Sequence, residues 1–238
     1  MRLGTVITLP DVGLAELTAS AVDFVWIDLE HGALDTGDVQ PLAIAARAAG
    51  AECFVRLPSA DDRAVGPVLD AGVDGVVVPR VEHAAEAEAV VGRLRYPPRG
   101  SRGLAARRAS AYGLRAPEGD PRCVVQIESE AGAAEAERIA AVEGVEALVA
   151  GCADLAADVG ETVNADAPRL CDAIARVRDA CETAGAVFGL AGPEDLRALM
   201  ELTPSMPDLA VLGADMRIYA RALDERFHTT RREAHVGA

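Results

Sequence analysis

The chain has 238 residues, half of them hydrophobic and only 3% aromatic, enough for one large domain with a sizeable core. Its formal net charge of −15 argues against nucleic acids and anionic membrane surfaces as partners, because both favour basic faces. We expect no membrane span, since no apolar run approaches about 18 residues. The N-terminus lacks a signal-peptide pattern, and the five cysteines form no CxxC pair, so we expect a cytoplasmic location with reduced thiols.

The sequence contains no lysine, and all 23 basic residues are arginine. A Schiff base with a carbonyl substrate or with pyridoxal phosphate needs a lysine amine that can lose its proton, whereas arginine stays protonated. The composition therefore excludes lysine-dependent aldolases and pyridoxal-phosphate enzymes.

Short β-branched runs alternate with Ala-rich helical stretches along the chain. We predict strands at 4–8, 23–28, 52–57, 74–78, 122–127, 146–150, 186–190 and 208–212. Helical patterns lie at 38–49, 61–71, 82–94, 129–141, 166–184, 193–201 and 214–226. Residues 96–120 are rich in Pro, Gly and Arg and predict an ordered loop with a short helix.

This alternation predicts an α/β protein with a (β/α)₈ TIM barrel, in a single domain over residues 1–238. A doubly wound open sheet is the alternative. It is disfavoured because no GxGxxG follows the first strand, where a dinucleotide-binding fold needs it.

Polar residues gather where the predicted strands end, the face at which barrels carry their catalytic groups. These residues are Asp28, Glu30, His31, Arg56, Gln126, Glu128, Gly151, Cys152, Ala153 and Asp154. Taken singly, some have a purely structural explanation: Asp28 could cap a following helix, and Arg56 could be a solvated charge at a strand end. Together they place acids, a histidine and an arginine around one rim.

The carboxylates of Glu128 and Asp154 are predicted to lie on neighbouring strands, where they repel unless a proton or cation lies between them. A hard divalent cation such as Mg²⁺ or Mn²⁺ takes oxygen ligands, often one or two carboxylates plus substrate and water. A histidine-rich zinc site is not expected, because His83 begins a helix and two of the other three histidines, His228 and His235, lie in the tail.

Gly151 ends a predicted strand, and a short helix begins at about Ala153. The free N–H groups at a helix start attract a carboxylate or phosphate. An anion held there would lie beside Asp154, so a substrate with adjacent carboxylate and keto oxygens could reach both a metal and these amides.

With these residues in place, the chain resembles the HpcH/HpaI family of metal-dependent class II pyruvate aldolases. The matching segments occur in family order between about residues 4 and 227: "DFVWIDLEHG", "FVRLPSAD", "VLDAGVDGVVVPRVE", "RYPPRGSRG", "VVQIESEAG", "GVEALVAGCADLAADVG" and "LGADMRIYARALDERF". The resemblance implies reversible cleavage of a 4-hydroxy-2-oxo acid, of the 2-dehydro-3-deoxyglucarate aldolase type, to pyruvate and an aldehyde through a metal-bound enolate.

The resemblance also implies roles for catalytic residues. His31 would be the acid/base and Arg56 would stabilise the enolate. In the family, an acid matching Asp70 is credited with raising the basicity of the histidine. Asp70 ends a predicted helix, near the opposite face of the barrel from His31, so it would have to act from a neighbouring subunit or by an unusual path. Asp28 remains the alternative partner.

For binding, the resemblance implies Glu128 and Asp154 as metal ligands, and Gln126 with the backbone of Ala153 and Asp154 as the holder of the pyruvyl part. The metal would be Mg²⁺ or Mn²⁺, with Co²⁺ as a further candidate, and no organic cofactor is needed. Small-molecule partners would be pyruvate or oxaloacetate and an aldehyde. The family also suggests a hexamer with exchange of the C-terminal helix. Cys152 stands where the family usually has Pro, which leaves substrate preference open.

Three alternatives remain. A citryl- or malyl-CoA lyase would need a basic groove for the nucleotide, for which the sequence offers Arg102, Arg107 and Arg108. A phosphate-binding barrel isomerase would have to use Gly192 and Gly213, neither of which lies in a glycine-rich loop. The third alternative is a non-catalytic barrel that binds 2-oxo acids.

Overall fold

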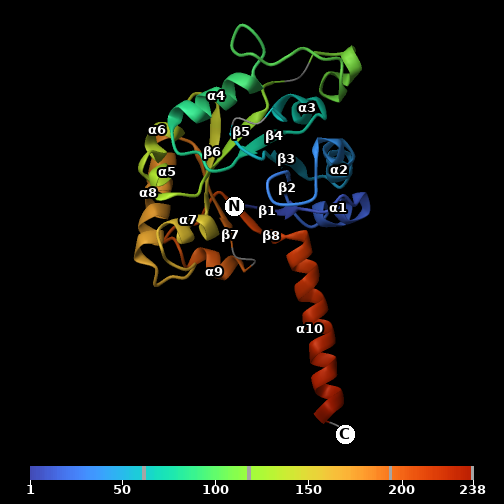
Figure 1. Cartoon of the computed structure of the whole chain (residues 1–238), viewed down its shortest axis with the longest axis vertical. Helices are drawn as coiled ribbons and strands as arrows, with labels where there is room; N and C mark the ends of the chain where they lie inside the picture. Colours follow the sequence, from blue (N-terminus) through green and yellow to red (C-terminus); the bar gives the residue numbers. More distant parts are fainter. Residues whose placement is uncertain (61–62, 117–118, 193–194, 237–238) are drawn as a thin grey trace.

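The strands of the computed structural model form a closed parallel barrel (Figure 1). The structure describes residues 1–60, 63–116, 119–192 and 195–236, with side chains described as far as residue 227. In these residues eight strands pair in chain order and the last closes on the first: β1 (Arg2–Ile7), β2 (Phe24–Asp28), β3 (Glu52–Arg56), β4 (Gly75–Val78), β5 (Arg122–Ile127), β6 (Val145–Gly151), β7 (Val187–Gly192) and β8 (Leu209–Ala214). The predicted (β/α)₈ barrel is confirmed.

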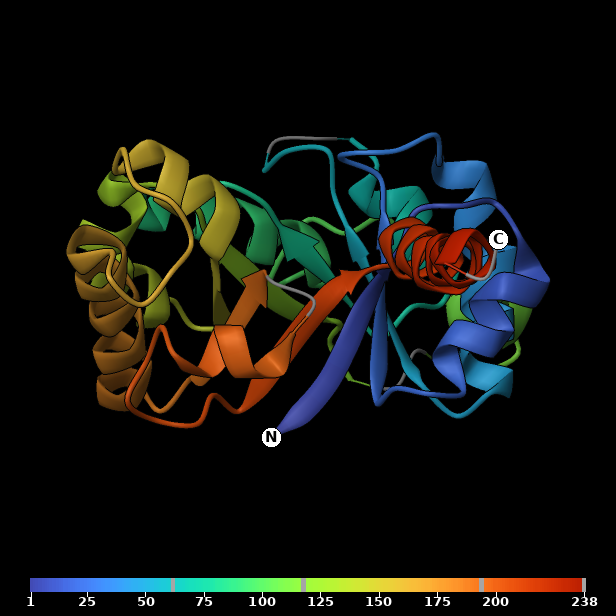
Figure 2. The same cartoon turned by 90° about the horizontal axis from the view of Figure 1, so that it is seen from below.

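Helices follow the strands and cover the outside of the barrel (Figures 1 and 2). They are α1 (Val12–Ala19), α2 (Thr36–Ala48), α3 (Val65–Asp70), α4 (Ala84–Leu94), the 3₁₀ helix η1 (Arg108–Gly113), α5 (Glu130–Ala134), α6 (Ala136–Ala140), α7 (Cys152–Asp158), α8 (Pro168–Ala184), α9 (Leu196–Met200) and α10 (Asp215–Val236). No helix among the described residues is both long and apolar enough to cross a bilayer.

Two helical predictions differ from the structure, and one helix was not predicted. The pattern at 129–141 is two helices, separated at Glu135, whose φ of −97° and ψ of 3° leave the helical region. The last helix runs ten residues beyond its predicted end, because the polar tail after Phe227 has no Pro or Gly to stop it before Gly237. Helix α1 has no predicted counterpart, although Asp11 caps it by accepting the N–H of Leu14 at 2.7 Å. Residues 61–62 and 193–194 of two predicted helices lie outside the described residues.

Strand β2 shows how the sequence fills both faces of the sheet. All five of its residues are buried, as expected for a parallel strand covered on both sides. Phe24 and Trp26 lie in the barrel interior, and Val25 and Ile27 alternate with them toward the helices. Phe54 of β3 meets Phe24 edge to face at 6.2 Å. Aromatic rings thus fill the N-terminal half of the barrel, and the polar residues lie at its C-terminal mouth.

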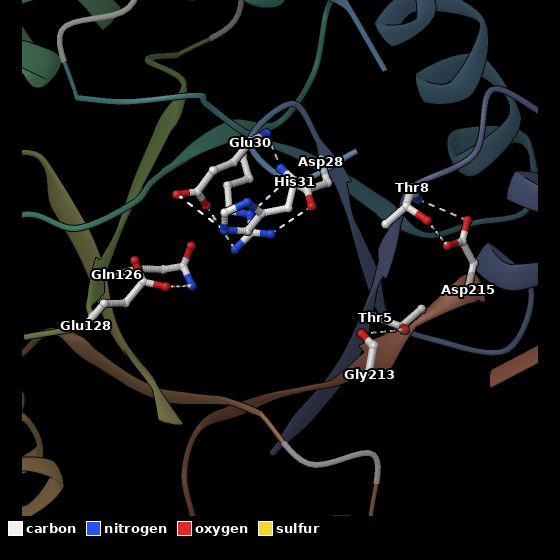
Figure 3. A network of polar contacts seen from close by, with 10 residues as sticks. Thr5, Thr8, Asp28, Glu30, His31, Gln126, Glu128, Gly213 and Asp215 are labelled. Carbon is white, nitrogen blue, oxygen red and sulfur yellow. Dashed lines mark hydrogen bonds and ion pairs between the residues drawn. The ribbon is translucent and has the colours of Figure 1, made fainter. Parts of the chain in front are cut away.

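Within the described residues, helix α10 contacts the barrel near its start, against β1 and β8. Asp215 is 4% exposed and accepts hydrogen bonds from the N–H and hydroxyl of Thr8, at 3.0 and 2.6 Å, and from the N–H of Leu9 at 3.3 Å (Figure 3). Beyond this point the helix projects away from the strands (Figure 1). The large apolar side chains that it exposes are Met216, Ile218, Tyr219, Leu223 and Phe227. The described chain therefore leaves an apolar helix face without a partner of its own.

Candidate active site at the C-terminal mouth of the barrel

The site is organised by a buried ion pair between Asp28 and Arg56. The two residues are register partners at the ends of β2 and β3. Arg56 donates from Nε to Oδ1 at 2.9 Å and from Nη2 to Oδ2 at 2.7 Å, a two-point contact that fixes the guanidinium plane. Burial raises the pKa of Asp28, but the hydrogen bonds and charge of Arg56, with the N–H groups of Glu30 and His31, bring it below its usual value. Asp28 is therefore ionised at neutral pH.

The turn after β2 places Glu30 and His31 beside this pair (Figure 3). Oδ1 of Asp28 accepts the N–H of Glu30 at 3.0 Å and of His31 at 3.3 Å, which closes the turn. Glu30 then reaches Arg56, with Oε2 3.1 Å from Nη1, and His31, with Oε1 3.8 Å from Nε2. The His31 side chain is 67% exposed and faces the open mouth. Among the described residues, the carboxylate beside the imidazole is thus Glu30, while Asp28 contacts only the backbone of His31.

Glu128 lies across the mouth, directly after β5 (Figure 3). Its Oε1 accepts a hydrogen bond from Nε2 of Gln126 at 3.0 Å, and its Oε2 accepts the N–H of Arg80 at 2.9 Å. Gly151 of β6 leaves the space for it, because a Cβ there would lie 2.7 Å from Oε1. Burial raises the pKa of Glu128 to about 7, and the charges of Glu30 and Asp154 also raise it, against the lowering effect of the Arg80 N–H and of Arg56.

The donor set at the mouth fits a hard divalent cation. The carboxylates of Glu30, Glu128 and Asp154 repel one another, and burial raises the pKa of Glu30 despite the nearby positive charges. Oε1 of Gln126 is buried and has no hydrogen-bond partner among the described residues. Carboxylate and amide oxygens are the ligands that Mg²⁺ and Mn²⁺ prefer. In the described part of the chain no three His, Cys, Asp or Glu side chains form a ready-made cluster, so Glu128 and Asp154 would share the ion with substrate and water.

Helix α7 begins at this mouth. Gly151 is extended at φ −80° and ψ 91°, and the helix starts at Cys152. The N–H groups of Ala153 and Asp154 belong to its first turn and have no acceptor within the described residues. Cys152 points into the packing, fully buried, and burial raises the pKa of its thiol to about 12. Cys152 therefore packs and is not a nucleophile.

The structure does not bring Asp70 to this site. It is the last residue of α3, which leads into the N-terminal end of β4. Asp28, Arg56 and Glu128 lie at the opposite, C-terminal ends of their strands. A contact between Asp70 and His31 would therefore need a second copy of the chain, and the role of Asp70 stays a prediction.

One contributor, Arg80, was not among the predicted site residues, and one predicted residue, Glu30, has a contact that the sequence did not indicate. Arg80 follows β4 and adopts a left-handed φ of 47°, an uncommon conformation for a residue with a side chain. This conformation accompanies the hydrogen bond from its N–H to Glu128. Its position two residues after the end of β4 could have marked Arg80 as a site residue. Its backbone conformation could not be predicted from the sequence. Glu30 stood among the predicted polar residues at the strand ends, whereas its ion pair with Arg56 could not be read from the sequence.

A (β/α)₈ barrel with paired acids, an arginine and a histidine at its C-terminal mouth defines an acid–base enzyme site. The model of the HpcH/HpaI aldolase/citrate lyase family matches residues 13–211. The chain belongs to this family.

Named relatives agree with this assignment. A hydroxypyruvate/pyruvate aldolase from Paraburkholderia phytofirmans is 38% identical, over 76% of this chain and 74% of the relative. A 4-hydroxy-2-oxovalerate aldolase from Rhodococcus jostii is 35% identical, over 95% of this chain and 91% of the relative. The crystal structure of a family member from Burkholderia cenocepacia superimposes with a TM-score of 0.89 at 33% identity, covering 97% of this chain and 94% of that one.

The raised pKa of Glu128 predicts a pH-dependent stability in metal-free buffer. The folded pKa is about 7 and the unfolded value is 4.5, so Glu128 favours the folded state fully below pH 4.5 and loses this contribution as the pH rises through 7. The free energy of unfolding of the wild type, relative to Glu128→Gln, should fall by up to about 3 kcal/mol over this window. Urea unfolding from pH 5 to 8 measures the difference. Exposed Glu88→Gln is the control and should follow the wild type, whereas parallel curves for the wild type and Glu128→Gln would contradict the assignment.

Proposed function

We propose that this protein is a divalent-metal-dependent aldolase that reversibly cleaves a 4-hydroxy-2-oxo acid to pyruvate and an aldehyde. The observation that carries the proposal is the fixed guanidinium of Arg56 at the mouth that also holds Glu128 and Gln126. The names of the relatives, a hydroxypyruvate/pyruvate aldolase and a 4-hydroxy-2-oxovalerate aldolase, support the same reaction class.

Glu128 and Asp154 would hold the metal ion, which supplies Lewis-acid polarisation of the 2-oxo group when it is bound. The unpaired Oε1 of Gln126 lies within the same group of oxygens. The free N–H groups of Ala153 and Asp154 would donate hydrogen bonds to the carboxylate of the substrate. These contacts would hold the 2-oxo acid at the mouth, beside His31 and Arg56.

His31 removes the proton from the 4-hydroxyl group, directly or through a water, and the carboxylate of Glu30 lies 3.8 Å from its Nε2. The C3–C4 bond breaks, the aldehyde leaves, and the electron pair becomes the pyruvate enolate. Asp28 takes two of the five N–H donors of Arg56, and Glu30 contacts Nη1 as an ion pair at 3.1 Å, so donors on Nη1 and Nη2 remain for the enolate oxygen. Return of a proton to C3 completes pyruvate. Oxaloacetate decarboxylation passes through the same enolate.

Asp28 acts in this scheme through Arg56 and through the turn that carries His31. Asp70 would contribute only from a neighbouring subunit.

Of the alternatives, a citryl- or malyl-CoA lyase is less well supported, because Arg102 and Arg108 line a cavity next to Asp74 and Pro121, at the N-terminal ends of β4 and β5 and away from the mouth. The five cysteines are all free thiols, four of them buried, which suits the cytoplasm.

The proposed reaction predicts that pyruvate alone exchanges its methyl protons with deuterated solvent when Mg²⁺ or Mn²⁺ is present. Arg56 interacts more strongly with the enolate oxygen than with the neutral ketone, so Arg56→Ala should slow exchange by about 10²–10³. Pyruvate affinity should fall much less. Proton NMR follows the exchange.

Arg56→Lys should restore the rate only in part, since an ammonium lacks the planar fork. Arg56→Ala leaves the buried carboxylate of Asp28 without its ion-pair partner and could therefore unfold the protein. The double variant Asp28→Asn/Arg56→Ala removes that buried charge, so slow exchange in a folded double variant reports the loss of Arg56 from the reaction. Absence of exchange in the wild type with either metal points instead to a non-catalytic binder, and normal exchange in Arg56→Ala removes Arg56 from the mechanism.

Removal of the metal should stop the exchange. Glu128→Gln and Asp154→Asn should each weaken Mn²⁺ binding by at least about tenfold, because each loses a charged oxygen ligand. Calorimetric titration with Mn²⁺ measures this without any assay of turnover, and exposed Asp158→Asn on the same helix is the matched control. Equal Mn²⁺ affinity in the wild type and in both variants would refute this ligand pair. Borohydride with pyruvate should leave the protein active, since no lysine is present to form an imine.

We also propose that α10 packs against a second copy of the chain, in a hexamer. Its 22 residues span about 33 Å, and its large apolar side chains up to Phe227 are exposed in the part of the chain that the structure describes. Leu223→Glu should therefore convert the assembly to smaller species, while Glu225→Gln on the same helix should not. Light scattering distinguishes the two results. A monomeric wild type would disprove this arrangement.

A further inference from the structure

The carboxylate of Glu128 is held by two hydrogen bonds from different segments of the mouth. Nε2 of Gln126 donates to its Oε1 at 3.0 Å (Figure 3), and the N–H of Arg80 donates to its Oε2 at 2.9 Å. Each oxygen thus has one donor. A carboxylate offers about four acceptor positions, so about two remain for an ion. The two bonds fix the plane of a side chain that is only 3% exposed.

The hydrogen bond from Arg80 goes with an uncommon backbone conformation. Arg80 has a φ of 47°, in the left-handed region that Gly and Asn adopt readily and β-branched residues rarely adopt. The chain is attached to β5 on both sides of this residue. Val78 is in register with Val125, and the N–H of Val81 donates to the carbonyl of Gln126 at 3.2 Å. The neighbouring strand therefore maintains the strained conformation.

The side chain of Arg80 contributes little to this arrangement. It is exposed and makes no hydrogen bond or ion pair with another residue that the structure describes. The positive charge that lowers the pKa of Glu128 is that of Arg56, whereas Arg80 acts on this pKa through its N–H. What Glu128 receives from position 80 is thus a backbone donor, which any residue except Pro can supply if it adopts the same φ.

Gly151 of β6 provides the space in which the carboxylate lies. A Cβ at this position would lie 2.6 Å from Cγ and 2.7 Å from Oε1 of Glu128. The φ of Gly151 is −80°, which any residue adopts, so the position requires the missing side chain rather than the freedom of a glycine backbone. Gly151 also precedes α7, whose first turn carries Asp154. One residue therefore serves both proposed metal ligands.

We propose that Arg80, through its left-handed backbone, and Gly151, through its missing side chain, are positioning residues that hold the Glu128 carboxylate in its metal-binding orientation. Neither is itself a ligand, and both act through Glu128. A ligand that is fixed in advance loses little freedom when the ion binds, so such outer contacts raise the affinity for the ion. This role rests on the metal site proposed above, whereas the contacts themselves can be tested without metal.

Arg80→Asn and Arg80→Val form a matched pair, because both remove the guanidinium and asparagine is the one that tolerates the left-handed region. Calorimetric titration of the full-length protein with Mn²⁺ compares them. Arg80→Val should bind Mn²⁺ at least about tenfold more weakly than Arg80→Asn, the size typical of losing an outer hydrogen bond to a ligand. Arg80→Ala replaces Arg80→Val if the latter does not fold, with a smaller loss expected. Equal affinities in the matched pair would overturn the role of the backbone.

Gly151→Ala adds one methyl group against Glu128. In metal-free buffer it should lower the melting temperature by about 3 °C or more, because overpacking a buried site is unfavourable. In a Glu128→Ala background the same change should have a much smaller effect, since the atoms that clash are absent. Such non-additivity indicates a direct contact. The control is Gly92→Ala, whose added Cβ meets no atom within 4 Å and should lower the melting temperature in neither background.

Gly151→Ala should also weaken Mn²⁺ binding, whereas Gly92→Ala should not. Additive shifts of the melting temperature would overturn the contact between Gly151 and Glu128. If the wild type binds Mn²⁺ and both Arg80→Val and Gly151→Ala bind it as tightly, the positioning role fails and the metal site stands. If the wild type binds no Mn²⁺, the proposed metal-dependent function fails and the positioning role fails with it, even where the melting temperatures show the contact.

Discussion

The buried pair of Asp28 and Arg56 is the contact on which the mouth of the barrel depends. Four donors converge on one carboxylate: Nε and Nη2 of Arg56 and the N–H groups of Glu30 and His31. A buried ion pair contributes little net stability, because desolvation offsets its attraction. Its effect is geometric. It sets the plane of the arginine and the path of the turn, and through that turn it places Glu30 and His31.

The mouth carries more negative than positive charge. Glu30, Glu128 and Asp154 act on one another, and the described residues at this site oppose them with Arg56. Such an arrangement is stable only with a proton or a cation among the acids. Because the pKa of Glu128 is raised, Glu128 binds a proton more readily than a free carboxylate does. A divalent ion would take the place of that proton, and its charge would also polarise a substrate oxygen. The excess negative charge at the mouth thus accounts both for the raised pKa of Glu128 and for the proposed binding of a metal ion.

At the opposite face of the barrel Arg102 is buried, with its guanidinium on the ring of Tyr96 and with Nε and Nη2 unpaired among the described residues. Between the two faces lies the aromatic interior of Phe24, Trp26 and Phe54, which separates the charges. The large apolar side chains of α10 form a separate surface, which the described residues of the same chain leave exposed.

The sequence by itself determined the alternation of strands and helices, because β-branched runs and Ala-rich segments report local preference and burial. It also determined which residues stand at strand ends, so Asp28, Arg56 and Glu128 were identifiable before the fold was known. Only the tertiary structure decided their partners. The register that pairs Asp28 with Arg56 and the left-handed Arg80 whose N–H reaches Glu128 both depend on contacts between residues distant in the chain. Such contacts leave no local pattern, since they follow from barrel closure rather than from any segment's own preference.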